Sequence, residues 1–234
     1  MRCVSEFMRL CAGLGLAAIP LAAPVSAQIR IDASAGWVTD YRYRGISLSD
    51  GRPAFQGGLE VSARDWFAGT WGSTIHDHDG SGMELDLYGG RRGAIHDLNY
   101  ALTGYLYLDP SRSDMNYAEV QALLDRKIGN VDAEIEVSLA PEQTHLYRTG
   151  LYLAAGLSVP LVIPGTSLSA HAGYEDGAWR HKTDWDVGAD YRRGSLRLGA
   201  HLIGTRGPDC RQTVGRAAGT ALVGSARFEL RAGS

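Results

Sequence analysis

Apolar and polar side chains alternate with a period of two along almost the whole chain from Gln28 onward. The segment 131–139, VDAEIEVSL, shows the pattern most clearly, because every second residue is apolar and acids or serine stand between them. Successive side chains of a β-strand point to opposite faces, so each such segment predicts a strand with one apolar and one polar face. Breaks of Gly, Pro, Asp, Asn or Arg-Gly divide the chain into about twelve segments of this kind. The alternation therefore predicts an all-β fold.

The connections between the expected strands alternate in length. Those after odd-numbered strands are the longer ones, at 44–52, 76–82, 109–115, 140–146, 176–183 and 205–219. Most of the others are short turns such as the Arg-Asp pair at 64–65, with 160–166 as the exception. Long loops at one end and short turns at the other are typical of outer-membrane barrels, and an even strand number places both chain ends on the turn side. We therefore expect an up-and-down antiparallel transmembrane β-barrel formed by residues 28–234.

Residues 1–27 have the three parts of a signal peptide. Arginines at positions 2 and 9 precede an apolar run at 10–23, and small residues at positions 25 and 27 form a small-x-small cleavage site. Met8 is an alternative start, because it leaves one arginine and the whole apolar run in place. We expect cleavage before Gln28 and export of the mature chain. Beyond this segment no apolar window of about 18 residues occurs, so helical membrane spans are not expected.

Charge and cysteine content narrow the possible functions further. The formal net charge of the 234 residues is −3, and no basic run interleaved with aromatic residues occurs, so nucleic-acid binding is not expected. Cys3 and Cys11 belong to the expected signal peptide, which leaves Cys210 as the one cysteine of the mature chain. An intramolecular disulfide is therefore excluded.

Aromatic residues on the apolar faces gather near the expected strand ends. We interpret the first strand as running from Ile29 to Tyr43, and the segment 37–58 as a hairpin with one aromatic and one charged face. Aromatic girdles mark both interfaces of outer-membrane barrels, although β-propensity alone also enriches aromatic residues in strands. The expected girdle positions are Tyr41, Tyr43, Phe55, Tyr174 and Trp185 toward the loops, and Tyr100, Tyr191 and Phe228 toward the turns.

A soluble β-sandwich is the structural alternative, because it also alternates an apolar inner face with a charged outer face. Three features favour the barrel: the signal peptide, the difference between loops and turns, and strands of about nine or more residues, the length that crosses a bilayer.

One segment resembles a known family. The stretch VTDYRYRGISLSD at 38–50, continued by RPA at 52–54 and QGG at 56–58, is similar to the opening signature of the TorF family of porins, which are exported proteobacterial proteins. FAGTWGS at 67–73 and ELDLYGG at 84–90 resemble further motifs of that family. The resemblance implies an outer-membrane β-barrel with passive channel activity. The chain departs from the usual pattern after Phe228, where ELRAGS follows in place of the terminal aromatic residue that the outer-membrane assembly machinery reads.

The charged strand faces are expected to line the lumen. The expected pore-lining residues are Asp40, Arg42, Arg44, Gln56, Glu60, Glu84, Asp86, Asp132, Glu134, Glu136, Asp186, Asp190, Arg197 and Arg227. Acids outnumber bases in this set, and acid-rich pore walls favour cations. We expect passive diffusion of small hydrophilic solutes with a mild cation preference, and outer-membrane lipid, these solutes and the assembly machinery as partners. The alternative is a closed structural or interaction barrel, in which Arg42 and Arg44 pair with Glu60, Glu84 and Asp86.

A loop at 76–82 carries the densest set of possible ligands. Its Asp-x-Asp-Gly motif resembles part of a calcium loop, but the remaining ligand spacing is missing, so no metal and no cofactor are expected. Ser73, His76 and Asp77 together would supply the groups of an outer-membrane lipid hydrolase. No nucleophile elbow accompanies them, so we expect no enzymatic activity.

Overall fold

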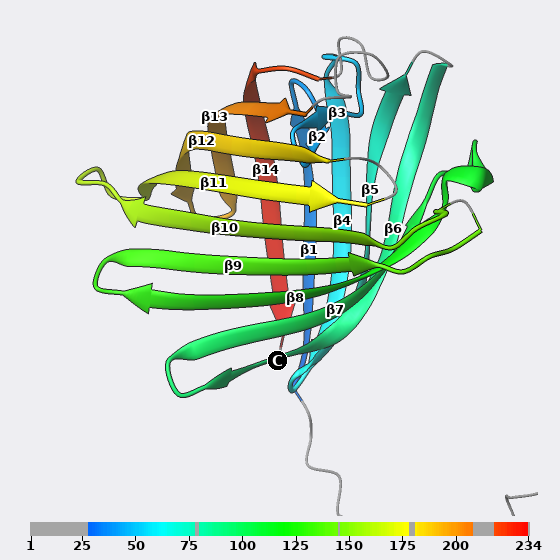
Figure 1. Ribbon diagram of the computed structural model, residues 1–234. Coiled ribbons are helices and arrows are strands. Elements are labelled where there is room, and N and C mark those ends of the chain that lie inside the picture. The colour runs from blue at the N-terminus through cyan, green and yellow to red at the C-terminus, as the bar shows by residue number, and fades with distance from the viewer. Residues whose placement is uncertain (1–27, 78–79, 145, 178–180, 208–217, 234) are drawn as a thin grey trace, which may run out of the picture.

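The computed structural model describes residues 28–77, 80–144, 146–177, 181–207 and 218–233 (Figure 1). The expected signal peptide and Cys210 lie outside the described residues. The long strands are β1 Ile29–Val38, β4 Ala54–Ala63, β5 Trp66–Asp77, β6 Gly80–Ile95, β7 Leu98–Leu108, β8 Tyr117–Ile128, β9 Val131–Ala140, β10 Gly150–Pro160, β11 Thr166–Asp176, β12 Lys182–Arg193, β13 Leu196–Arg206 and β14 Ala221–Gly233. The short elements are β2 Arg42–Tyr43, β3 Ile46–Ser47 and the 3-10 turn η1 Ser113–Met115. Within the described residues, no helix is long and apolar enough to cross a membrane.

The long strands form one closed antiparallel barrel. Each pairs with its neighbours in the chain, and β1 closes the ring by pairing with β14 on one side and β4 on the other. Twelve strands from the described part of the chain make up this ring. The pairing of Arg30 with Gly233 brings the start of β1 and the end of β14 to the same end of the barrel. The expected up-and-down transmembrane β-barrel is confirmed.

The two faces of the barrel wall follow the alternation in the sequence. On β9, Ile135, Val137 and Leu139 are exposed on the outer face, whereas Glu136 and Ser138 turn inward. In the paired strands, inward-facing residues stand opposite inward-facing residues, so the division into an apolar outer face and a polar inner face continues from one strand to the next. The exposed outer face is apolar, with Leu59, Leu87, Leu102, Leu106, Leu153, Leu157, Leu168, Val187, Leu202 and Phe228 among its residues. Such a surface matches hydrocarbon, and a closed ring leaves no strand edge unpaired within it.

The connections differ at the two ends of the barrel. At the turn end, Arg64 and His96 adopt positive φ angles of 55° and 58° in tight hairpins. At the loop end, the longest described connection joins β1 to β4 and contains the small β2–β3 sheet. The expected loop at 76–82 is wrong, because β5 and β6 continue as a ladder as far as the pair Asp77–Gly80.

The first strand is shorter than the alternation predicts. β1 ends at Val38, and the next residue, Thr39, makes its contacts with Gly224 of β14 through both its backbone nitrogen and its hydroxyl, each at 2.9 Å. The chain then leaves the wall, although the period of two continues through the β2–β3 hairpin. The interpretation of 29–43 as one strand is therefore wrong, since a local pattern does not record where a strand leaves its sheet.

Candidate functional site in the barrel interior

The β2–β3 hairpin turns back on itself at Arg44 and Gly45. These two residues have φ angles of 46° and 79°, between the paired residues Tyr43 and Ile46. A two-residue hairpin loop with positive φ at both central positions is a type I′ turn, which suits the twist of the flanking strands. We call the segment 40–49 the inward hairpin, because its side chains contact the inner wall of the barrel.

The base of the inward hairpin is held by buried polar contacts. Asp40 is 5% exposed and accepts hydrogen bonds from the Ser47 hydroxyl and, at 2.6 Å, from Arg42 Nε. Arg42 Nη1 donates to the carbonyl oxygen of Gly219, just before β14, at 2.7 Å. The Ser49 hydroxyl accepts a hydrogen bond from the Tyr41 backbone nitrogen at 2.8 Å. The expected lumen residues Asp40 and Arg42 thus hold the hairpin in its fold and against the wall.

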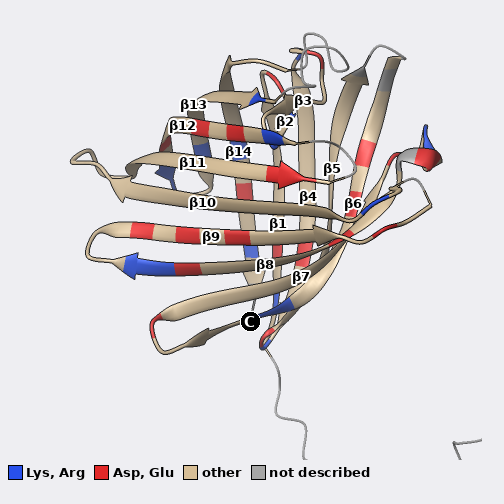
Figure 2. Cartoon of the chain, viewed as in Figure 1, with Lys and Arg blue, Asp and Glu red and all other residues tan. Residues whose placement is uncertain are grey.

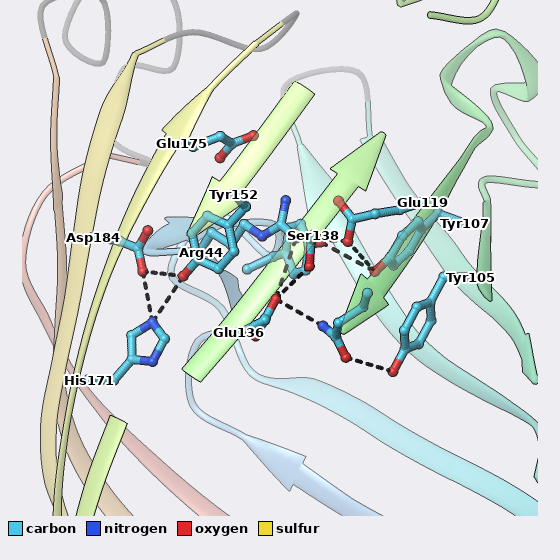
Figure 3. Close-up of polar contacts among 12 residues, drawn as sticks. Arg44, Tyr105, Tyr107, Glu119, Glu136, Ser138, Tyr152, His171, Glu175 and Asp184 are labelled. Carbon is cyan, nitrogen blue, oxygen red and sulfur yellow. Dashed lines mark hydrogen bonds and ion pairs between the residues drawn. The ribbon is translucent and has the colours of Figure 1, made fainter. Parts of the chain in front are cut away.

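Arg44, at the tip, reaches the opposite wall (Figure 3). Its Nη2 donates to Glu119 Oε1 at 2.8 Å and lies 3.8 Å from Glu136 Oε1. The side chains of Arg44 and Glu119 are 9% and 2% exposed. The guanidinium carbon lies 4.0 Å from the centre of the Tyr152 ring, which adds a cation–π contact. Burial lowers the pKa of Arg44, but Tyr43 and Glu119 outweigh burial and hold it above its usual range, so the side chain stays charged.

A second ion pair holds the backbone of the tip. Lys182 of β12 donates to the carbonyl oxygen of Arg44 at 2.8 Å, and its Nζ also lies 2.7 Å from Glu175 Oε2. Gly45 packs against β13 so closely that an added Cβ would lie 2.6 Å from the carbonyl oxygen of Gly204. Through Arg44, Gly45 and the base, the inward hairpin therefore contacts strands on several sides of the ring. It spans the interior near the loop end.

The expected girdle positions Tyr41 and Tyr43 are wrong. Tyr41 is 8% exposed inside the barrel, with its ring 5.4 Å from that of Trp71. The Tyr43 ring lies 5.9 Å from that of Tyr107, which stacks on Tyr117 at 4.5 Å. Both tyrosines lie inside the barrel and do not face lipid, because β1 leaves the wall before them. The rings of Phe67, Tyr88, Tyr105, Tyr107 and Tyr117 form a continuous row of neighbours along the inner wall of β5 to β8.

Next to the inward hairpin lies a cavity of about 820 Å³. Its acidic lining residues are Asp86, Asp125, Asp132, Glu134, Glu136, Asp184 and Asp186, and its arginines are Arg42 and Arg44. Figure 2 shows acidic residues gathered on β9 and β12. His171 and His201 also line this cavity, and each contacts a carboxylate: His171 Nε2 lies 3.3 Å from Asp184 Oδ1, and His201 Nδ1 lies 2.7 Å from Asp186 Oδ1. This part of the interior is mostly negative.

A second cavity of about 360 Å³ has the opposite character. Its basic lining residues are Arg30, Arg92, Arg197, Arg227 and Arg231, from β1, β6, β13 and β14. Several of these pair with acids: Arg92 lies 2.6 Å from Glu60, Arg197 lies 3.0 Å from Glu229, and Arg231 lies 3.1 Å from Asp32. Acids and arginines thus concentrate in different parts of the interior.

The strand residues of the expected pore-lining set all belong to the inward-facing series. Gln56, Glu60, Glu84, Asp86, Asp132, Glu134, Glu136, Asp186, Asp190, Arg197 and Arg227 share the inner face through the register. The pairing of Arg42 and Arg44 with Glu60, Glu84 and Asp86, named for the alternative of a closed barrel, does not occur, because Arg42 pairs with Asp40 and Arg44 with Glu119 and Glu136.

Several interior charges are absent from the expected set. These are Arg92, Glu119, Asp125, Glu175, Lys182 and Asp184. Glu119 occupies an inward position of β8, where Leu123 and Leu124 blur the alternation. Applying the period of two to every position of β8, β11 and β12 would have found Glu119, Glu175, Lys182 and Asp184.

The hydrolase alternative lacks its Ser–His pair. Ser73 is 2% exposed and points inward, and His76, three positions on in the same regular strand, points to the other face. Two of the possible calcium ligands, at 78 and 79, lie outside the described residues. Within the described part of the chain, no group of three or more His, Cys, Asp or Glu residues is placed to hold a metal ion.

Comparison with known proteins places the chain in a family. The model of the family described as "Bacterial protein of unknown function (Gcw_chp)" matches residues 22–231. The chain belongs to the Gcw_chp family. The resemblance to the TorF porins stays a prediction, since the Gcw_chp description does not carry that name. No curated protein matches the sequence.

Solved structures share the barrel fold of this Gcw_chp chain at low sequence identity. The COG4313 outer membrane channel from Pseudomonas putida F1 superposes with a TM-score of 0.53 at 14% identity, covering 90% of this chain and 97% of that one. The KdgM porin gives a TM-score of 0.55 at 8% identity, with 85% and 98% covered. The KdgM porin in complex with disordered oligogalacturonate gives 0.51 at 7% identity, with 86% and 97% covered. The fold is that of outer-membrane channels.

Proposed function

We propose that this Gcw_chp protein is an outer-membrane channel for passive diffusion of small hydrophilic solutes. The observation that carries the proposal is a charged, cavity-containing interior inside an apolar barrel wall. A purely structural barrel gains nothing from unpaired charges in its interior, because burying a charge without a partner is costly. Glu134, which lines the cavity, is exposed and has no ion pair among the described residues, as expected for a carboxylate that faces water inside the barrel.

We further propose a mild preference for cations. Carboxylates dominate the cavity of about 820 Å³, where only the Arg42 and Arg44 side chains and the two histidines oppose them in the described residues. Both arginines are already paired with acids. Acid-rich walls lower the barrier for cations and raise it for anions. The arginines of the smaller cavity reduce this preference without reversing it.

The inward hairpin is the proposed constriction of the channel. It contacts β8 and β9 through Arg44, β12 through the Arg44 carbonyl group and β13 through Gly45. A segment held on so many sides narrows the space left for solutes near the loop end. The mature chain would sit in outer-membrane lipid after export and insertion by the assembly machinery, with the inward hairpin at the loop side.

Planar-bilayer recording of the purified full chain tests this function. We expect steady single-channel conductance in potassium chloride and, in a salt gradient, a reversal potential of the sign that cation preference gives. Anion preference would contradict the selectivity, and absence of any conductance in a folded, inserted barrel would contradict the channel.

A closed barrel is the second candidate, favoured by the buried pair of Arg44 and Glu119. If the inward hairpin stays closed, the native chain does not conduct, and release of the hairpin opens it. This candidate would be supported if Arg44→Ala conducts and the native chain does not. Equal heat-modified mobility of the two on gels would show that both are folded barrels.

A further inference from the structure

Among the described residues, one buried carboxylate of the larger cavity has no ion pair. Asp86 of β6 lines that cavity, is 8% exposed, and has its Oδ1 buried without a hydrogen bond. In the part of the chain that the structure describes, no ion pair of Asp86 is recorded. Glu84, two positions earlier on the same face, also has a buried oxygen, Oε2, without a hydrogen bond. Two neighbouring buried carboxylates repel each other, and a cation placed beside them would relieve that cost.

Aromatic rings surround this carboxylate. The register places Trp71 of β5 directly opposite Asp86 on one side and Tyr107 of β7 on the other. Tyr41 of the inward hairpin lies with its ring 5.4 Å from that of Trp71, and Tyr105 stacks beside Tyr107 at 5.6 Å. All four rings line the same cavity as Asp86. Aromatic faces attract cations, most strongly organic ammonium groups and guanidinium groups.

We propose that Asp86 and these aromatic residues bind the ammonium group of an alkyl diamine, a refinement that rests on the proposed channel function. An ammonium group has three hydrogen-bond donors for the carboxylate oxygens and a positive charge for the ring faces. Divalent metal ions fit less well, because they require several oxygen ligands around one point, and the described residues offer no such group.

Other carboxylates of the same cavity suit a second ammonium group. Glu134 and Glu136 of β9 and Asp186 of β12 line the same cavity as Asp86. Glu136 Oε1 accepts hydrogen bonds from Gln121 at 2.9 Å and from Ser138 at 2.8 Å. Glu134 has no ion pair among the described residues, so its carboxylate is open to a ligand. A flexible diamine can therefore place one charge at Asp86 and the other toward β9. This separates a diamine from a simple monovalent metal cation as the preferred ligand.

Isothermal titration of the detergent-solubilised full chain with 1,4-diaminobutane tests the proposal. We expect saturable binding that Asp86→Asn weakens by about tenfold or more, since a charge-assisted hydrogen bond is lost. Asp65→Asn, an exposed turn residue paired with Arg91, is the matched control and should bind as the native chain does. Trp71→Leu should weaken binding, and Trp71→Phe, which keeps an aromatic face, should retain more of it.

Equal diamine affinity of the native chain and Asp86→Asn would overturn the proposal, as would equal binding of the uncharged 1,4-butanediol. Asp86→Asn removes an uncompensated buried charge, so we expect it to fold, and a heat-modifiable gel shift checks this. Conductance is measured on the same preparations. Conduction without diamine binding overturns this inference and leaves the channel standing, whereas diamine binding without conduction supports the binding site and contradicts the channel.

Discussion

Arg44 Nη2 lies 2.8 Å from Glu119 Oε1 although the two residues are 75 positions apart in the sequence. The pair joins the tip of the inward hairpin to the inner wall of β8, and both side chains are almost fully buried. Breaking a buried ion pair leaves one charge without a partner, which is far more costly than losing an exposed pair. This pair is therefore a strong contact of the hairpin tip, beside those that Lys182 and Gly45 make.

Replacing Arg44 with alanine should raise the conductance of the channel. The side chain that bridges to Glu119, Glu136 and Tyr152 is removed, so the hairpin loses its hold on the opposite wall. Single-channel recording measures the change. Arg91→Ala, which removes an exposed pair at the turn end, should leave the conductance unchanged. A native conductance for Arg44→Ala would show that the tip does not restrict the pore.

The same substitution should lower the stability of the barrel by about 3–5 kcal/mol, because Glu119 is left as a buried, unpaired charge. Adding Glu119→Gln should recover part of the loss, since an uncharged amide is less costly to bury. Urea unfolding of folded barrels in lipid vesicles compares the native chain, Arg44→Ala and the double variant. Additive losses in the double variant would mean that the two side chains do not stabilise each other.

Gly45→Ala should release the hairpin tip, whereas Gly51→Ala should not. Both glycines have positive φ, 79° and 70°, so alanine strains the backbone at each by about 1–2 kcal/mol. A Cβ at Gly45 would also lie 2.6 Å from the Gly204 carbonyl oxygen, and a Cβ at Gly51 would meet nothing within 4 Å. We expect Gly45→Ala to lose more stability and to gain more conductance than Gly51→Ala, and these two differences measure the contact of the tip with β13. Equal effects of the two variants would argue against close packing of the tip.

Neutralising the acids of β9 should reduce the cation preference. Glu134→Gln with Glu136→Gln removes two carboxylates from the larger cavity, while Arg197→Gln with Arg227→Gln removes two arginines from the smaller one. Reversal potentials in a potassium chloride gradient should move toward zero in the first double variant and away from zero in the second. Movement in the same direction in both would show that these side chains do not set the selectivity.

A charge on the outer face of the wall should destabilise the barrel according to its depth. Leu102, in the middle of β7, is 54% exposed on that face, and Ile128, at the turn end of β8, is 60% exposed. Leu102→Arg should cost about 2–4 kcal/mol in lipid vesicles, and Ile128→Arg about 0–1 kcal/mol. Heat-modifiable mobility and urea unfolding measure the difference. Equal, small effects at both positions would contradict a membrane-embedded wall.

The sequence alone determined the wall of the barrel. Because side chains alternate along any strand, the period of two assigned Glu134, Glu136 and Arg197 to the same face as the interior, and Leu59 and Phe228 to the lipid side, without knowledge of their neighbours. The number of strands and the contrast between most loops and turns followed from the same local breaks.

Only the tertiary structure determined the interior. The hairpin at Arg44 has the same alternation as a wall strand, so the sequence predicted that Tyr41 and Tyr43 face lipid, whereas they pack inside. The pairing of Arg44 with Glu119 depends on closure of the ring and on the exit of the chain from the wall after Val38. The physical reason is that periodicity depends only on which way a side chain points relative to its own backbone. Contacts across the barrel depend instead on which distant strands lie opposite each other once the ring has closed.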